Sequence, residues 1–198
     1  MTGADPTETD PVERLRADPH LGPVVEAHGP VTVEPAADPF SRFVVAIVNQ
    51  QLSTQSAAAI RERLFDQFEV TPEAMLAADE AALREVGLSR QKVAYVRNVA
   101  EAYRDGKVSP ERYASFTDEE VVADLTDIRG VGDWTARIYL MFVLGREDVF
   151  PVGDLGIRKA MAALFELEES DRDAMVETAE RWAPHRTYAS LYLWRSVD

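Results

Sequence analysis

The residue with the clearest chemical potential in this 198-residue sequence is Asp154, which ends a Gly/Pro-rich segment, residues 149–154, and directly precedes a helical pattern. A carboxylate held at such a point can stabilise positive charge that develops on a substrate, and it can orient or deprotonate a water molecule. Aspartate is also among the most favourable helix N-caps, so the position taken alone favours a structural role. The neighbouring segments of the sequence are needed to choose between a catalytic and a structural role for Asp154.

A second informative segment, residues 125–136, reads Leu-Thr-Asp-Ile-Arg-Gly-Val-Gly-Asp-Trp-Thr-Ala. We expect a short helix to end near Ile128 and a longer one to begin after Gly132. Gly130 and Gly132 permit a positive φ and close approach of another backbone. The first amides of the longer helix lack an intrahelical partner and, with the helix dipole, form an anion site that suits a DNA phosphate. The two glycines alone would also fit a plain connection between helices.

The net charge of −14 argues against nucleic-acid binding, because phosphate contacts usually need a basic face. Two considerations weaken that objection. Backbone amides bind phosphate without basic side chains. An acidic, lysine-poor surface also suits concentrated salt, where the Debye length falls to about 3 Å at 1 M and distant repulsion is screened. We therefore expect a halophilic source.

Other parts of the composition exclude whole classes of site. The chain has no cysteine, which rules out disulfides, thiolate-held iron–sulfur clusters and cysteine zinc sites, and its three histidines lack the spacing of a helical metal pair. No apolar run reaches the roughly 18 residues of a membrane span, and the N-terminus does not resemble a secretory signal. We expect an intracellular, cytoplasmic monomer with no membrane partner.

The elements that must position these residues are helices. Apolar residues recur at three- and four-residue steps from Phe40 onward, and only residues 31–33 hint at a strand, so we predict an all-α chain of about ten helices. Residues 1–11 are expected to be a disordered acidic tail, and residues 12–198 one domain. Within that domain we assign 40–125 mostly to a first lobe, 125–136 to the hairpin, and 12–39 with 137–198 to a second lobe.

In order and content, these segments resemble the helix-hairpin-helix superfamily of DNA glycosylases, and within it the alkylpurine, or 3-methyladenine DNA glycosylase II, branch. The resemblance covers residues 21–194. It is carried by Asp38-Pro39-Phe40, residues 47–53, Gly87 with Lys92, the hairpin, the Asp154 loop and residues 182–194.

The resemblance implies a two-lobed helical fold with its active site in the cleft between the lobes. Its partner would be double-stranded DNA with damaged bases, and the damaged nucleotide would be flipped out of the duplex. Asp154 would be the catalytic residue. The DNA backbone would be held by Gly130, Val131, Gly132 and Thr135. No cofactor is required, although backbone carbonyls of Thr126, Ile128 and Val131 would bind a structural Na+ or K+.

The resemblance also implies a set of substrate-binding residues. Trp134 and Trp194 match aromatic pocket positions, which would attract a cationic base through cation–π contact. Gln50 and Gln51 match the segment that fills the gap left by the flipped nucleotide, and Tyr188 with Tyr192 would line the same cleft. Core packing for the aromatics, and internal hydrogen bonding for the glutamines, remain the alternatives.

These expectations combine into a function. The enzyme would hydrolyse the N-glycosidic bond of alkylated purines such as 3-methyladenine and 7-methylguanine. Bifunctional relatives carry a nucleophilic lysine two residues after the second hairpin glycine, whereas this chain has Trp134, which predicts a monofunctional enzyme without lyase activity. The alternatives are a glycosylase for oxidised or deaminated bases, a non-enzymatic helix-hairpin-helix DNA-binding module, and a helical protein-binding scaffold.

Overall fold

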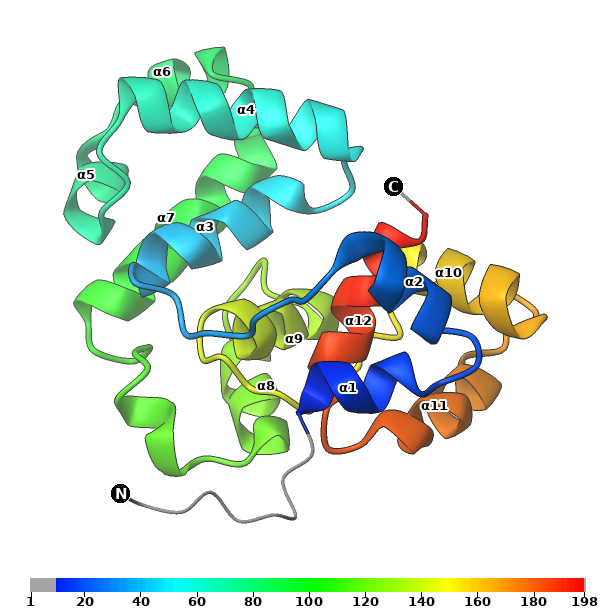
Figure 1. The fold of residues 1–198 in the computed structure, drawn as a ribbon. Coiled ribbons are helices and arrows are strands. Elements are labelled where there is room, and N and C mark those ends of the chain that lie inside the picture. The colour runs from blue at the N-terminus through cyan, green and yellow to red at the C-terminus, as the bar shows by residue number, and fades with distance from the viewer. Residues whose placement is uncertain (1–9, 198) are drawn as a thin grey trace. The chain divides into compact units, whose positions relative to one another are not determined.

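The computed structural model describes residues 10–197, and every regular element within them is a helix: twelve α-helices and two short 3-10 helices (Figure 1). The all-α prediction is confirmed. Residues 31–33 form no strand and belong to an extended connector. None of the helices in the described part is long and apolar enough to cross a membrane.

The predicted disordered tail lies mostly outside the described residues, but its last two residues are helical or cap a helix. Asp10 is the N-cap of α1 (Pro11–Arg16), where its carboxylate accepts a hydrogen bond from the Val12 amide at 2.8 Å. Pro11 stands in the first helical turn, where its missing N–H would be unpaired in any case. Residues 10 and 11 of the predicted tail are therefore part of the first helix and its cap.

The contacts divide the described chain into two compact units, which we call the terminal unit (residues up to Val33 and from Arg146) and the middle unit (Glu34–Gly145). The sequence-based boundaries, at 39 and 137, differ from these. The chain does not change units at 137 because α9 (Asp133–Phe142) runs unbroken through that position. The Ala36 amide donates to the Val143 carbonyl at 3.1 Å, which ties residues 34–39 to the end of the same helix.

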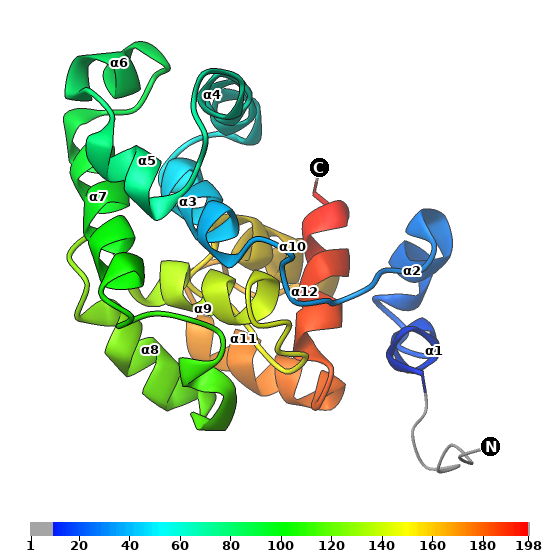
Figure 2. The ribbon, with the colours of Figure 1, turned by 90° about the vertical axis from the view of Figure 1, so that its left-hand side faces the viewer.

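The middle unit packs its helices around α7. The elements are α3 (Pro39–Asn49), α4 (Thr54–Gln67), α5 (Pro72–Ala77), α6 (Glu80–Glu85), α7 (Arg90–Arg104), η1 (Arg112–Ser115), α8 (Asp118–Thr126) and α9. Helix α7 packs against α3, α5 and α6, and α9 packs against α3 and α8 (Figure 2). The apolar stripe predicted from Phe40 to Val48 faces this core, with Phe43 and Ile47 fully buried. The hairpin is thus held at α8 and α9 by a packed helical scaffold.

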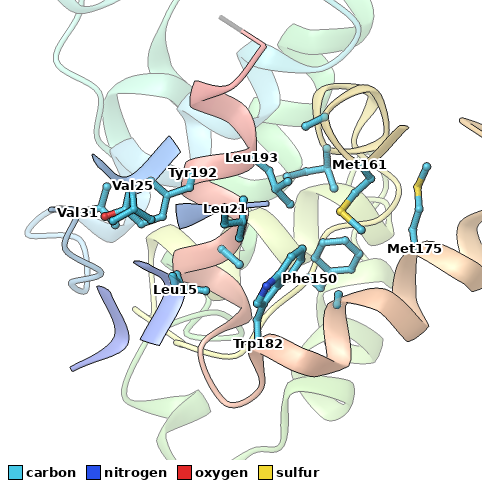
Figure 3. Packing of buried hydrophobic residues seen from close by; sticks show 14 of the residues in the cluster. Leu15, Leu21, Val25, Val31, Phe150, Met161, Met175, Trp182, Tyr192 and Leu193 are labelled. Atoms are coloured by element: carbon cyan, nitrogen blue, oxygen red, sulfur yellow. The ribbon is translucent and has the colours of Figure 1, made fainter. Parts of the chain in front are cut away.

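The terminal unit joins the two ends of the chain around α12 (Arg186–Arg195). Its other elements are α1, α2 (Gly22–His28), α10 (Leu155–Phe165), α11 (Arg172–Ala179) and η2 (Glu180–Trp182). Helix α12 contacts α1, α2 and α10, which explains why its apolar residues are not confined to one stripe. Leu15, Leu21 and Leu193 are fully buried in the core that these helices share (Figure 3). This core fixes α12 beside the start of α10.

Candidate active site and nucleic-acid interface

Asp154 lies at the N-terminus of α10, at the end of a tight turn. The turn is closed by the Asp154 amide, which donates to the Pro151 carbonyl at 2.8 Å, and it is anchored by the Thr187 hydroxyl, which accepts from the Val149 amide at 3.0 Å. The Asp154 carboxylate accepts from the Ile157 amide at 3.0 Å through Oδ1, the bond of an N-cap. The structural role anticipated for an aspartate at this position is therefore present, and it fixes the carboxylate at a defined place.

Trp194 meets this carboxylate directly. Its indole Nε1 donates to Oδ1 of Asp154 at 2.8 Å, from a half-buried ring on α12 that packs against the core of the terminal unit. Gly156 leaves room for the contact, since a Cβ built there would lie 3.1 Å from Asp154 Oδ1 and 3.0 Å from Trp194 Cδ1. The sequence pointed to the Trp194 ring, and it did not reveal the N–H bond or the role of Gly156.

The two tyrosines expected to line the cleft differ from each other. Tyr192 is fully buried, with 0% of its surface exposed, and its hydroxyl donates to the Gly29 carbonyl at 2.9 Å, so it is a core residue and not a lining residue (Figure 3). Tyr188 is half-buried, and its hydroxyl lies 3.3 Å from the Glu147 carboxylate. Burial, and then Glu147, raise the pKa of Tyr188, so this side chain stays neutral over the physiological range.

The hairpin joins α8 to α9 through a turn that is closed by the Val131 amide, which donates to the Ile128 carbonyl at 2.9 Å. Gly130 has φ +106°, and a Cβ there would fall 2.2 Å from the Tyr95 ring, so the protein itself requires glycine. Gly132 is different: its φ of −101° suits any residue, and a Cβ there would meet nothing within 4 Å. The positive φ permitted at both positions is used only at Gly130.

Helix α9 begins at Gly132 without a side-chain cap, so the amides of its first turn point away from the helix. The nearest acid, Asp133, is paired with Arg137 at 2.9 Å. Two residues predicted to hold DNA have buried side chains, Val131 and Thr135 (2% exposed), because both pack inward. Any contact they make with a backbone phosphate must come from main-chain atoms.

Gln50 links the end of α3 to the hairpin. Its side-chain amide donates to the Gly130 carbonyl and to the Thr135 hydroxyl, each at 2.9 Å. Lys92, whose pKa is lowered by burial, donates to the carbonyls of Val48 and Gln50 at 2.6 and 2.8 Å and so holds the same turn from α7. In this structure the Gln50 side chain is engaged within the middle unit, as in the alternative of internal hydrogen bonding.

Gln51 and Leu52 form an exposed tip beyond this link. Gln51 has φ +55°, a left-handed conformation that is uncommon outside glycine, and its side chain is exposed. Leu52 is 39% exposed, which is high for a large apolar side chain in this protein. The tip therefore exposes one polar and one apolar side chain next to the carbonyl of Gln50 that Lys92 holds.

The candidate site residues are divided between the middle unit and the terminal unit. Trp134, half-buried in the first turn of α9, lies in the middle unit with Gln50, Gln51 and the hairpin, whereas Asp154, Trp194 and Tyr188 lie in the terminal unit. No group of three or more His, Cys, Asp or Glu side chains in the described residues could hold a metal ion. The cation predicted at the hairpin would be held by main-chain oxygens, which is a separate kind of site.

Comparison with known proteins identifies the family of this chain. The family described as HhH-GPD superfamily base excision DNA repair protein matches residues 44–185. The chain is 34% identical to DNA-3-methyladenine glycosylase 1 of Schizosaccharomyces pombe, over 80% of this chain and 72% of that protein. It is 30% identical to the putative DNA-3-methyladenine glycosylase YfjP of Bacillus subtilis, over 90% of this chain and 66% of that one, so it spans about two thirds of that relative.

Solved structures show the same similarity. The S. pombe 3-methyladenine DNA glycosylase Mag1, in complex with abasic DNA, superposes with a TM-score of 0.85 at 30% identity, covering 95% of this chain and 96% of that one. A DNA-3-methyladenine glycosidase from Bacillus halodurans gives 0.76 at 33% identity, covering 96% and 90%. The chain therefore belongs to the HhH-GPD superfamily of base excision DNA repair proteins.

Proposed function

We propose that this protein is a monofunctional DNA glycosylase that hydrolyses the N-glycosidic bond of alkylated purines, such as 3-methyladenine and 7-methylguanine, in flipped-out nucleotides of double-stranded DNA. The observation that carries the proposal is the Asp154 carboxylate, fixed at the start of α10 by the Ile157 amide and the Trp194 indole, in a chain of this superfamily. Relatives named as 3-methyladenine glycosylases support the choice of lesion.

Hydrolysis of this N-glycosidic bond requires few protein groups besides the Asp154 carboxylate. Cleavage of the bond builds positive charge on C1′ and O4′ of the sugar, and a carboxylate beside them stabilises that charge and orients the attacking water. An alkylated purine such as 7-methylguanine already carries positive charge, so it leaves as a neutral base. No general acid is then needed.

Aromatic and backbone groups would complete the substrate contacts. Trp134 offers an electron-rich ring to a cationic base, and it occupies the position where a lysine would confer lyase activity. The reaction would therefore stop at an intact abasic strand. The exposed tip of Gln51 and Leu52 would fill the space that the flipped nucleotide leaves, while Gln50 supports the tip from within.

The hairpin would bind a DNA phosphate through the first amides of α9. The open space at Gly132, which the protein's own packing does not require, suits the close approach of an external group. A hollow of about 450 Å³ beside the hairpin is lined by residues that include two arginines and no acid, although Glu80 lies 3.5 Å from one of them: Arg90, Gln91, Ala94, Tyr95, Asn98 and Arg129. The charge around the hairpin is mixed, because a neighbouring hollow that shares Asn98 and Arg129 is also lined by the acids Asp124 and Asp127.

A monovalent cation would fit the hairpin turn by donor chemistry. The carbonyls of Thr126, Ile128 and Val131 belong to one turn, closed by the Val131–Ile128 hydrogen bond. Neutral carbonyl oxygens are hard ligands that suit Na+ or K+. Bound there, the cation would add positive charge beside a DNA phosphate.

The test of this function is the fate of a defined duplex that carries one 7-methylguanine. We expect the native protein to release the base and to leave the strand uncut until alkali is added. Release without alkali-labile sites, or strand cleavage by the protein alone with a trapped Schiff base, would contradict a monofunctional glycosylase.

A further inference from the structure

The indole of Trp194 points its N–H, and not its face, at the carboxylate of Asp154. The Nε1–Oδ1 distance of 2.8 Å is that of a charge-assisted hydrogen bond. The ring itself is held by α12, whose neighbours Tyr192 and Leu193 are fully buried in the core of the terminal unit. The donor is therefore fixed by the core and not by the loop that carries Asp154.

Two donors converge on one oxygen of that carboxylate. The Ile157 amide approaches Oδ1 from α10 at 3.0 Å, and the indole approaches the same atom from α12. One hydrogen bond leaves a carboxylate able to pivot about it, whereas a second donor from a separate helix restricts that rotation. The pair of bonds therefore sets the direction in which the carboxylate presents its negative charge.

Gly156 is the third part of the arrangement. An added Cβ at this position would fall 3.0 Å from Cδ1 and 3.3 Å from Nε1 of Trp194. Such distances are tighter than ordinary contacts, so a side chain at 156 would push the indole away from the carboxylate. Its backbone is helical with ordinary φ, so the need for glycine here is one of space.

We propose that Trp194 and Gly156 are positioning residues that orient the Asp154 carboxylate toward the sugar, and that the Trp194 N–H, not stacking of its ring on the base, is what the reaction requires. This inference rests on the proposed function of Asp154. Misplacement of a reacting group by about 1 Å can cost on the order of 10²-fold in rate, which sets the size of the effect.

The decisive variant replaces Trp194 with β-(3-benzothienyl)alanine, which keeps the shape and stacking surface of the ring but has sulfur where the N–H was. Single-turnover release of 7-methylguanine should fall on the order of 10²-fold, while the Kd for a duplex with an abasic-site analogue changes less than about twofold. Trp194→Phe should likewise lower the release rate and leave the Kd nearly unchanged. A native rate for the benzothienyl variant, or a loss confined to Kd, would overturn the proposal.

Gly156→Ala tests the spatial part without removing the donor. Its release rate should fall about tenfold, again with unchanged Kd, because the indole is displaced by only a few tenths of an ångström. Native release by Gly156→Ala would contradict the role given to this glycine.

The protein contains a matched control. Trp182 donates its indole N–H to the carboxylate of Asp18 at 2.9 Å, a bond of the same kind within the core. Trp182→Phe should lower the thermal unfolding midpoint and leave the release rate per folded molecule unchanged. An equal loss of rate in Trp182→Phe would show that the Trp194 effect is one of general stability, and would overturn the proposal.

The outcomes separate this proposal from the function on which it rests. If the native protein releases no alkylated base, the proposed function fails. If the native protein is active, Asp154→Asn is inactive and the benzothienyl variant is as fast as native, the function stands and only the positioning role fails.

Discussion

Two helix N-termini of this molecule use the same physical property in opposite ways. Helix α9 begins at Gly132, which has no side chain to satisfy the first-turn amides, and helix α10 begins at Asp154, whose carboxylate accepts from one of them. Both ends carry the partial positive charge of a helix dipole. At α9 the capping position supplies no negative charge, and the first-turn acid Asp133 is paired with Arg137, whereas at α10 the capping residue itself supplies the charge.

The difference shows how an acidic protein can act on a polyanion. The end of α9 is suited to attract a phosphate through backbone groups that no change in net charge removes. The end of α10 holds a carboxylate, which under the proposed function would stabilise the positive charge that develops on the sugar. Under the proposed function, glycine at one capping position would serve binding and aspartate at the other would serve the chemistry.

The largest effect is expected from removing the charge at the second of these ends. Asp154→Asn keeps the shape and the capping ability of the side chain but should lower single-turnover base release on the order of 10³-fold or more. The Kd for an abasic-site duplex and the unfolding midpoint should stay near native values. Quench-flow or manual sampling with chromatographic detection measures the rate, and a native rate would remove Asp154 from the catalytic role.

A smaller effect should follow from giving α9 the cap that α10 has. In Gly132→Asp the new carboxylate competes for the first-turn amides and repels a phosphate, so affinity should fall for all DNA sequences alike and the salt slope should decrease by about 1. Helix stability should rise by a few tenths of a kcal/mol. Gly132→Ala, which lacks the charge, should weaken binding less.

Fluorescence anisotropy over a salt series checks both Gly132 variants. If Gly132→Asp bound every duplex as well as the native protein, the hairpin would not be the phosphate site. A loss confined to one lesion type would assign it to base recognition.

The link between α3 and the hairpin should matter less for binding and more for stability. Gln50→Ala leaves the Gly130 carbonyl and the Thr135 hydroxyl without their donor and should cost about 1–3 kcal/mol of unfolding free energy, with a modest loss of DNA affinity. Its neighbour provides the control: Gln51→Gly relieves a left-handed φ and should not destabilise the protein. Urea unfolding measures the free energy of unfolding of both variants. Equal values for Gln50→Ala and Gln51→Gly would contradict a stabilising role of the Gln50 hydrogen bonds.

The smallest effect concerns acid stability of the terminal unit. Burial opposes ionisation of Asp148, but hydrogen bonds from Arg186 outweigh burial and lower the pKa of Asp148 below its ordinary value of 3.8. A carboxyl group whose pKa is lower in the folded state than in the unfolded state stabilises the folded protein at pH values above the unfolded-state pKa. This stabilisation is lost as the pH falls through the folded-state pKa.

Asp148→Asn should therefore be less stable than native near neutral pH, with a difference that shrinks as pH falls below 3.8. Urea titrations at a series of pH values measure it. A difference that stays constant with pH would show that the charge of Asp148 contributes nothing.

Local patterns predicted the local features well. Apolar spacing from Phe40 indicated helices, and the run from Leu125 indicated the hairpin, because both depend on residues close in sequence. The structure adds the reason for one hairpin glycine: Gly130 makes room for Tyr95, a residue 35 positions earlier, and no local pattern could show that.

Long-range contacts account for what the sequence could not show. Tyr192 lies in the core because α1, α2 and α10 pack around α12, and its hydroxyl donates to the Gly29 carbonyl. Gln50 is engaged because the hairpin lies beside the end of α3. The pocket role expected for Trp194 stays a prediction, and the sequence did not show that its indole N–H meets the Asp154 carboxylate. Each of these depends on how separate helices pack, which periodicity does not encode.

The most direct test of the central claim is release of free bases from methylated duplex DNA, resolved by chromatography, at low and at molar salt. We expect the protein to release 3-methyladenine or 7-methylguanine and to leave the duplex strands uncut. If neither base is released at either salt, while duplexes with oxidised or deaminated bases also stay intact, the protein is a DNA-binding module and the role given to Asp154 is wrong.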